Sequence, residues 1–211
     1  DYIDAGRPDR GVDILETALS WHPDNVDIMN NLGIAYLEQQ RPERAEAVLL
    51  RANAIDDSRF ETYINLSACA GAMQAYDRAV TYIDRAIDLA PEMAQAHITR
   101  ARMLAQLGRR EDARAALETA IRFDAENPEV YLELGNTCMQ LGQFGSAKDH
   151  YAAAAMRFPS QWRAHVGLAN ACVRLGELDA ALAAISVAER LVPENAQVAM
   201  LANQLRAAMD R

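Results

Sequence analysis

The stretch that decides the fold reads PEVYLELGNTCMQLGQFGSA, residues 128–147. Its apolar residues recur at helical spacing up to a hinge at Leu141-Gly142, and a second helical run begins directly after that hinge. Two further hinges of the same kind stand at Leu107-Gly108 and Leu175-Gly176, so the three glycines are 34 residues apart. A fixed period of this length indicates an array of helical repeats.

The same period runs through the chain when Val26, Phe60, Ala94, Pro128 and Trp162 are taken as position 1 of successive repeats. Small residues fill positions 8 and 20, and large apolar residues fill position 24. Small residues let two helix axes approach closely, while large ones fill the remaining gaps. The period therefore predicts packed helix pairs, A and B, with glycine at position 15 ending helix A and proline at position 32 following helix B. Position 27 is alanine in every copy: Ala18, Ala52, Ala86, Ala120, Ala154 and Ala188.

This pattern resembles the tetratricopeptide repeat (TPR) family. The segment Asn31-Leu32-Gly33-Ile34-Ala35-Tyr36 and the segment Glu129–Asn136 carry the resemblance, together with the alanines at positions 20 and 27. The resemblance covers essentially the whole chain and implies an all-α, right-handed superhelical solenoid of antiparallel helix pairs.

We expect one solenoid domain over residues 1–211. Residues 196–211 are expected to form a capping helix whose apolar face is Met200, Leu201 and Leu205. The remaining divisions are a partial repeat, 1–25, and five full repeats, 26–59, 60–93, 94–127, 128–161 and 162–195.

Composition favours proteins as partners. The chain has 30 acidic and 21 basic residues, a formal net charge of −9, which phosphate backbones repel, so no nucleic-acid partner is expected. No apolar run approaches the length needed to cross a bilayer, and no direct membrane insertion is expected. Nothing in the sequence argues for export, so a cytoplasmic location is the expectation.

Catalysis, a metal site and a cofactor are not expected. The chain has three cysteines, Cys69, Cys138 and Cys172, with no CxxC pair and no zinc-site spacing. Cys138 and Cys172 share position 11 of successive repeats, where neighbouring helices lie too far apart for a disulfide. His97 and His165 share position 4 two repeats apart, too distant to bind one metal ion, and are interpreted as core or groove histidines.

The resemblance implies that A helices line a concave face and that positions 2, 5, 6, 9, 12 and 13 meet a bound peptide. Asn31 and Asn65 share position 6, and Asn136 and Asn170 share position 9. An amide side chain both donates and accepts hydrogen bonds, so an asparagine ladder suits the backbone of an extended peptide. The alternative is asparagines on a solvated helix face, where they bond to their own backbone.

Charged and polar residues complete the predicted partner-binding set, which adds Arg102, Gln140, Arg163 and Arg174. The basic residues favour the C-terminal half, which predicts that an acidic segment or a free carboxylate docks near Arg163 and Arg174, beside Asn170. The alternative is a mixed solvated surface. The family's carboxylate clamp for chaperone tails finds no matching register here, so no tail of that type is expected to bind.

Arg100 departs from the repeat, because it stands at position 7, where the other full repeats have leucine. A buried charge must pair or reach the surface. The arginine-rich repeat around Arg100 is interpreted as either a docking patch or a locally loosened core.

The function expected from the sequence is a protein–protein interaction scaffold that binds a peptide or partner segment in the concave groove and nucleates a multiprotein assembly. The alternative is the substrate-recognition arm of a larger enzyme, for example a glycosyltransferase, with its catalytic domain outside these residues. Self-association through the solenoid ends or the groove is also considered.

Overall fold

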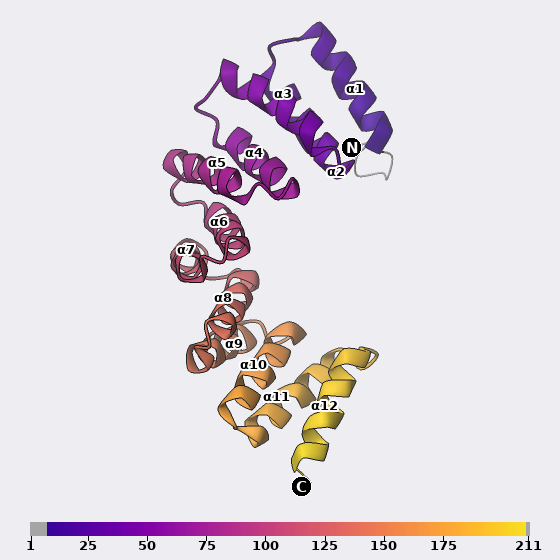
Figure 1. Ribbon diagram of the computed structural model, residues 1–211. Helices are drawn as coiled ribbons and strands as arrows, with labels where there is room; N and C mark the ends of the chain where they lie inside the picture. Colours follow the sequence, from indigo (N-terminus) through magenta and orange to yellow (C-terminus); the bar gives the residue numbers. More distant parts are fainter. Residues whose placement is uncertain (1–7, 210–211) are drawn as a thin grey trace. The chain divides into compact units, whose positions relative to one another are not determined.

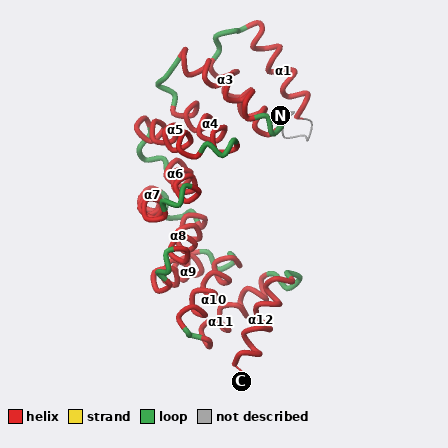
Figure 2. Tube along the Cα trace, viewed as in Figure 1, coloured by secondary structure: helices red, strands yellow, loops and turns green. Residues whose placement is uncertain are grey.

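Residues 8–209 are described by a computed structural model, and they form α-helices joined by short turns, with no strand in that range (Figure 1, Figure 2). Every A helix begins at repeat position 1 and every B helix at position 17, so the helix boundaries follow the sequence period. The A helices are α2 (Val26–Glu38), α4 (Phe60–Ala72), α6 (Ala94–Gln106), α8 (Pro128–Gln140) and α10 (Trp162–Leu175). The B helices are α3 (Pro42–Ile55), α5 (Tyr76–Leu89), α7 (Arg110–Phe123), α9 (Phe144–Arg157) and α11 (Leu178–Leu191). They are preceded by α1 (Pro8–Trp21) and followed by α12 (Ala196–Met209).

Two compact units make up the described chain, one ending at Arg109 and one beginning at Arg110. Unit 1 contains α1–α6, each helix packed on the next, and α2 also packs on α4. Unit 2 contains α7–α12, packed in the same sequential way, and α8 also packs on α10. The sequence expectation of an all-α array of antiparallel helix pairs is therefore confirmed. The single-domain division stays a prediction.

The core of each helix pair lies where the repeat pattern placed it. The alanines at positions 20 and 27 are buried, as at Ala45 and Ala52, and the large residue at position 24, here Leu49, is fully buried with them. A Cβ atom on Gly33, at position 8, would lie 2.7 Å from the Leu49 side chain. A larger residue in place of Gly33 would therefore force Leu49 to move, and every full repeat has a small residue, glycine, serine or alanine, at position 8.

The A helices end in a left-handed residue at position 15, whether or not that residue is glycine. Gly142 has a φ of 73°, and Gln40 and Gln74, which replace the glycine, have φ values of 58° and 59°. After each of them the chain closes with the same hydrogen bond, for example from the Gln143 N–H to the Cys138 carbonyl at 2.9 Å. This bond satisfies a carbonyl that the end of the helix would leave open. The hinge geometry is thus a property of the repeat and not of glycine alone.

The structure decides two points that concern single residues: which face of α12 is buried, and what holds the charge of Arg100. In α12 the buried face is Val198, Ala202 and Leu205, and the expected Met200 is wrong, since it is 59% exposed. Residues 198, 202 and 205 follow helical spacing, which turns residue 200 to the other side. Arg100 donates from Nε to the Asp84 carboxylate at 2.6 Å, so the charge at position 7 is held by an ion pair between α5 and α6.

Two neighbouring glycines should respond to alanine in opposite directions. A Cβ on Gly142 or on Gly145 meets no atom within 4 Å, so packing plays no part at either site. Gly142→Ala should destabilise unit 2 by about 1 kcal/mol, because the left-handed backbone conformation is higher in free energy for alanine than for glycine. Gly145→Ala, inside α9, should stabilise it by about 0.5 kcal/mol. Urea unfolding midpoints measure both changes.

Gln40→Gly serves as the control for the hinge argument and should raise the midpoint of unfolding, because it relieves the same backbone conformation in unit 1. Equal shifts for Gly142→Ala and Gly145→Ala would contradict the assignment of the effect to the backbone.

Candidate functional site

A groove of about 330 Å³ crosses the A-helix side of unit 2, over α8, α10 and α12. Its walls combine apolar surface with three amide side chains and one guanidinium. The lining residues are Leu132 and Asn136 of α8, Tyr151 of α9, Trp162, Arg163, Val166, Gly167 and Asn170 of α10, and Gln197 of α12. The helical repeat thus places residues that are far apart in the sequence along one surface.

Tyr151 forms the base of this groove. It occupies position 24, where the other full repeats have leucine or isoleucine, and it is 3% exposed. A Cβ on Gly135 would lie 2.6 Å from the tyrosine ring, and a Cβ on Gly167 would lie 2.4 Å from it. The ring therefore fits between α8 and α10 only because both glycines lack a side chain. Gly167 stands at position 6, where Asn31 and Asn65 stand in other repeats, so the tyrosine ring fills space that an asparagine side chain at residue 167 would need.

The Tyr151 hydroxyl fixes the orientation of Asn136. It donates to the Asn136 Oδ1 at 2.6 Å. Burial, and then the nearby Cys138 and Glu133, raise the pKa of Tyr151 to about 12, so the phenol stays protonated and remains a donor at physiological pH. With its oxygen engaged, Asn136 presents its NH₂ group to the groove. It is therefore suited to a carbonyl or carboxylate oxygen of a ligand.

The second amide and the charge of the groove come from α10. Asn170 is exposed, lies one repeat after Asn136 and lines the same groove. The Arg163 guanidinium lies over the Trp162 ring at 5.4 Å from its centroid, and Arg163 is the one charged residue among those lining the groove. The structure thus brings together three residues of the predicted set: Asn136, Arg163 and Asn170.

Two other predicted residues of unit 2 lie outside this lining. The Arg174 guanidinium stacks on the Phe144 ring at 4.0 Å from its centroid. Gln140 accepts from the Arg110 Nε at 3.3 Å. The groove lining therefore contains Arg163 and not Arg174, and the docking of a carboxylate near both arginines stays a prediction.

The predicted residues of unit 1 lie on its A helices. Asn31 on α2 is exposed, Asn65 on α4 is half-buried, and Arg102 on α6 is half-buried and has partners. Beneath this surface Asn30 donates from Nδ2 to the Thr62 hydroxyl at 3.0 Å, a buried bond that joins α2 to α4. The ladder formed by Asn31 and Asn65 stays a prediction.

Sequence reasoning missed Tyr151, Trp162 and Gln197 as groove residues. The signal for Tyr151 was present, because tyrosine at position 24 coincides with glycine at position 6 of the next repeat. Trp162 and Gln197 carried no such signal, because their contribution depends on how α10 and α12 pack in space.

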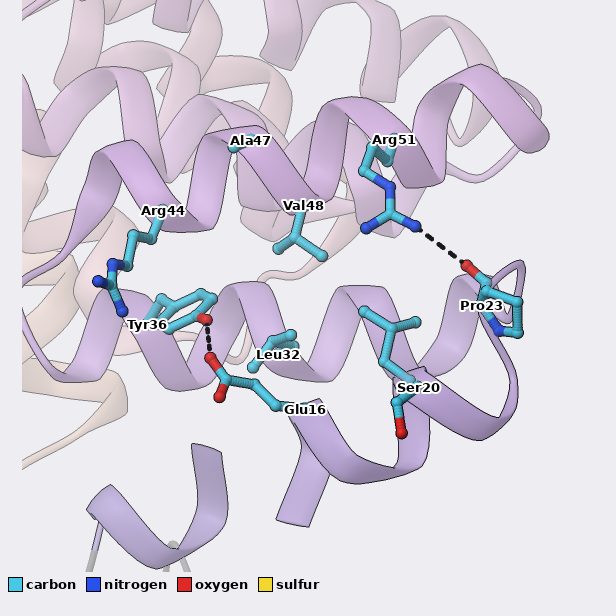
Figure 3. A pocket seen from close by; sticks show the side chains of 10 residues that line it. Glu16, Ser20, Pro23, Leu32, Tyr36, Arg44, Ala47, Val48 and Arg51 are labelled. Carbon is cyan, nitrogen blue, oxygen red and sulfur yellow. Dashed lines mark hydrogen bonds between the residues drawn. The ribbon is translucent and has the colours of Figure 1, made fainter. Parts of the chain in front are cut away.

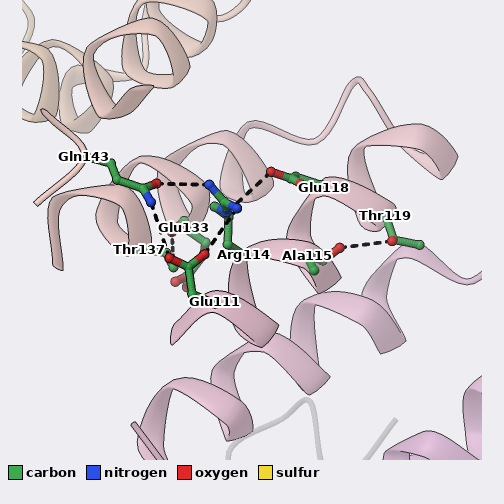
Figure 4. Close-up of polar contacts among 8 residues, drawn as sticks. All are labelled: Glu111, Arg114, Ala115, Glu118, Thr119, Glu133, Thr137 and Gln143. Carbon is green, nitrogen blue, oxygen red and sulfur yellow. Dashed lines mark hydrogen bonds and ion pairs between the residues drawn. The ribbon is translucent and has the colours of Figure 1, made fainter. Parts of the chain in front are cut away.

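Arginines of the third repeat are engaged in local contacts. Figure 4 shows Arg114 between two carboxylates of α7, with Glu111 at 3.2 Å and Glu118 at 3.7 Å. Arg114 also donates to the Gln143 side chain at 3.1 Å, which ties α7 to the turn before α9. This network, like the ion pair of Arg100, gives these arginines structural partners.

The cysteines and histidines are held in ways that fit structural roles. Cys69, Cys138 and Cys172 are free thiols and buried. His97 and His165 contact the carbonyls of Pro91 and Pro159 through Nε2, at 2.8 Å and 3.1 Å.

Across residues 8–209, no group of three or more His, Cys, Asp or Glu side chains has the arrangement of a metal site. Over the same range no helix has both the length and the apolar character needed to span a membrane.

The fit of Tyr151 predicts a coupled pair of substitutions. Gly167→Ala should destabilise the chain by about 1–3 kcal/mol, because the new methyl group collides with the tyrosine ring. Adding Tyr151→Leu, the residue type of other repeats, should recover part of that loss. Urea unfolding of the two single variants and the double variant measures the coupling. Additive losses would show that Gly167 and Tyr151 do not share this space.

The buried thiols should be unreactive in the folded chain. Burial raises the pKa of all three cysteines, that of Cys69 to about 12, so the reactive thiolate is scarce at pH 8. Reaction with Ellman's reagent should be slow in native buffer and fast in urea. Rapid native labelling of any of the three would contradict the burial.

Comparisons with known proteins agree with this architecture. Models described as tetratricopeptide repeat match residues 2–68, 60–93 and 132–196, and a model described as TPR repeat matches residues 101–142. No curated protein sequence matches the chain.

Several solved structures have the same fold. PilF of Pseudomonas aeruginosa superposes with a TM-score of 0.77 at 18% identity, over 98% of this chain and 92% of that one. YrrB, described as a TPR protein with an unusual peptide-binding site, gives a TM-score of 0.72 at 18% identity, over 92% and 97%. MamA of Desulfovibrio magneticus RS-1 gives 0.73 at 19% identity, over 81% and 97%. With the repeat period, the helix pairs and these matches in agreement, the chain belongs to the tetratricopeptide repeat family.

Proposed function

We propose that this chain is a protein-interaction scaffold that binds an extended segment of a partner protein in the groove of unit 2. The observation that carries the proposal is the convergence of Asn136, Asn170 and Arg163 on one groove whose base is Tyr151. The proposed role is binding without catalysis or a cofactor.

The groove suits the backbone of an extended chain. Stacked helices lie roughly 8–10 Å apart, which is about three residues of extended peptide. Asn136 on α8, Asn170 on α10 and Gln197 on α12 can therefore meet peptide groups at regular intervals. Asn136 offers a donor to a carbonyl, since Tyr151 holds its oxygen. These contacts read the backbone and leave the sequence of the partner open.

Side chains of the partner must supply the remaining affinity. Each amide contact contributes about 1 kcal/mol net, which ordering of the peptide largely offsets. Leu132, Val166 and the Trp162 ring provide apolar surface for side chains of the segment. Burial of the partner's apolar side chains between the amide contacts therefore supplies most of the net binding free energy.

The partner segment is proposed to carry an acidic group near α10. Arg163 is the charged residue of the groove, and a guanidinium forms strong hydrogen bonds with a carboxylate. No aspartate or glutamate is among the residues that line the groove, so no carboxylate of the lining competes with such a ligand. YrrB, which shares the fold, is described as having an unusual peptide-binding site, and this supports peptide binding as the type of function.

A peptide selection tests the proposal. Random peptides displayed on phage are selected on the full chain, and the affinity of the enriched peptides is measured by fluorescence anisotropy. Asn136→Ala combined with Asn170→Ala should weaken binding about tenfold or more, because two hydrogen bonds are lost. Arg163→Gln should weaken acidic peptides selectively and reduce the salt dependence of their binding.

Asn31→Ala combined with Asn65→Ala is the matched control, since it makes the same change on the A helices of unit 1. If the peptides bind the Asn31/Asn65 variant with unchanged affinity and the Asn136/Asn170 variant more weakly, binding is assigned to the groove of unit 2. Selected peptides that bind equally to the Asn136/Asn170 variant would refute the proposed site.

A further inference from the structure

A second groove lies on the B-helix side of unit 1, between α1 and α3 and above α2. Its volume is about 570 Å³ (Figure 3). One wall comes from α1 and the turn after it, the other from α3, and α2 forms the floor. The lining residues are Glu16, Leu19, Ser20, Pro23, Leu32, Tyr36, Arg44, Ala47, Val48 and Arg51.

The repeat provides an internal comparison for this groove. Between α9 and α11 of unit 2 lies a groove at the equivalent repeat positions, and its walls are apolar. Arg44 at position 19 corresponds there to Ala180, and Arg51 at position 26 corresponds to Val187. The fold therefore accepts small apolar residues at both positions. Two arginines are not required for the packing of a B helix.

Arg44 and Arg51 have no carboxylate partner among the described residues. The Arg44 guanidinium lies 6.0 Å from the centroid of the Tyr36 ring, and Arg51 donates to the Pro23 carbonyl at 3.2 Å. The carboxylate in the groove, Glu16, accepts a hydrogen bond from the Tyr36 hydroxyl (Figure 3).

Arginines at the same two positions of the next B helix behave differently. On α5, Arg78 pairs with Glu46 at 2.8 Å and Arg85 pairs with Asp88 at 3.3 Å. The chain has a net charge of −9, so carboxylates are abundant. Within residues 8–209, however, Arg44 and Arg51 contact the Tyr36 ring and the Pro23 carbonyl, and neither forms an ion pair with a carboxylate. The α1–α3 groove thus contains two guanidinium groups whose charges no carboxylate neutralises by direct contact within the described residues, and one carboxylate, Glu16, which is bound to the Tyr36 hydroxyl.

The spacing of these charges matches a helix. Arg44 and Arg51 are seven residues apart, which places them two turns and about 10.5 Å apart along α3. A helix lying parallel to α3 repeats its own positions i and i+7 at the same interval. Between the two arginines the groove has an apolar surface from Leu19, Leu32 and Val48. A residue at i+3 or i+4 of the docked helix would face that surface.

We infer that the α1–α3 groove docks an amphipathic helix of a partner protein, with carboxylates at positions i and i+7 facing Arg44 and Arg51 and a leucine-sized residue between them facing Leu32 and Val48. This surface is separate from the extended-peptide groove of unit 2 and uses a different form of ligand. A chain with both sites links two partners.

The test uses three fluorescein-labelled, alanine-rich helical peptides and the full chain. The first peptide has glutamate at i and i+7 with leucine at i+3 and i+4, the second has lysine at the two charged positions, and the third has the glutamates at i and i+5. Fluorescence anisotropy should show binding of the first peptide, weakening as salt rises, with the other two at least about fivefold weaker.

Variants assign the binding to this groove. Arg44→Ser with Arg51→Ser should weaken the first peptide about tenfold, whereas Arg78→Ser with Arg85→Ser, the matched change on α5, should alter it less than about twofold. Arg44→Glu with Arg51→Glu should transfer the preference to the lysine peptide. Equal binding of the glutamate and lysine peptides by the unchanged protein, or an undiminished affinity of the Arg44/Arg51 serine variant, would overturn the inference.

A second measurement needs no variant. Hydrogen exchange of the unchanged chain with the glutamate peptide should slow at amides of α1 and α3. Slowing confined to α8, α10 and α12 would place the peptide in the groove of unit 2 and overturn the α1–α3 assignment while leaving the proposed function intact.

Discussion

The close approach of the two helices in each repeat is the constraint on which the rest of the structure depends. Alanines at positions 20 and 27 and a small residue at position 8 bring the helix axes together, and the residue at position 24 fills the space that remains. Leu49 against Gly33 shows how little room is left, since a Cβ on that glycine would come within 2.7 Å. With the packing of each pair fixed in this way, the outward-facing positions are free to vary.

Tyr151 shows how a single exchange at a constrained position creates a site. A ring in place of leucine or isoleucine demands space on two neighbouring helices, and Gly135 and Gly167 provide it. Its hydroxyl then donates a hydrogen bond to Asn136 and so orients the amide of that side chain. A residue exchange in the core thereby changes the polar groups at the surface. In this way one repeat of the array gains a surface that the other repeats lack.

The two B-helix grooves show the converse case, in which the backbone is the same and only the surface differs. Positions 19 and 26 are arginines on α3 and α5 but alanine and valine on α11. On α5 the charges are neutralised by Glu46 and Asp88, whereas on α3 they face a groove. Identical residue types at identical repeat positions therefore differ in chemistry because their neighbours differ.

The sequence by itself determined the helix pairs, their boundaries, the buried positions and the hinge at position 15, because each depends on contacts that recur every 34 residues. It also identified Asn136, Asn170 and Arg163 as candidates, since their repeat positions predict the exposed side of an A helix. Only the tertiary structure decided that these three share a groove with Tyr151, Trp162 and Gln197, that Arg174 stacks on Phe144 instead, and that Met200 faces outward. Periodicity specifies which face of a helix a residue occupies, but the partners of a side chain depend on distances between helices, and those are set by packing that no single repeat contains.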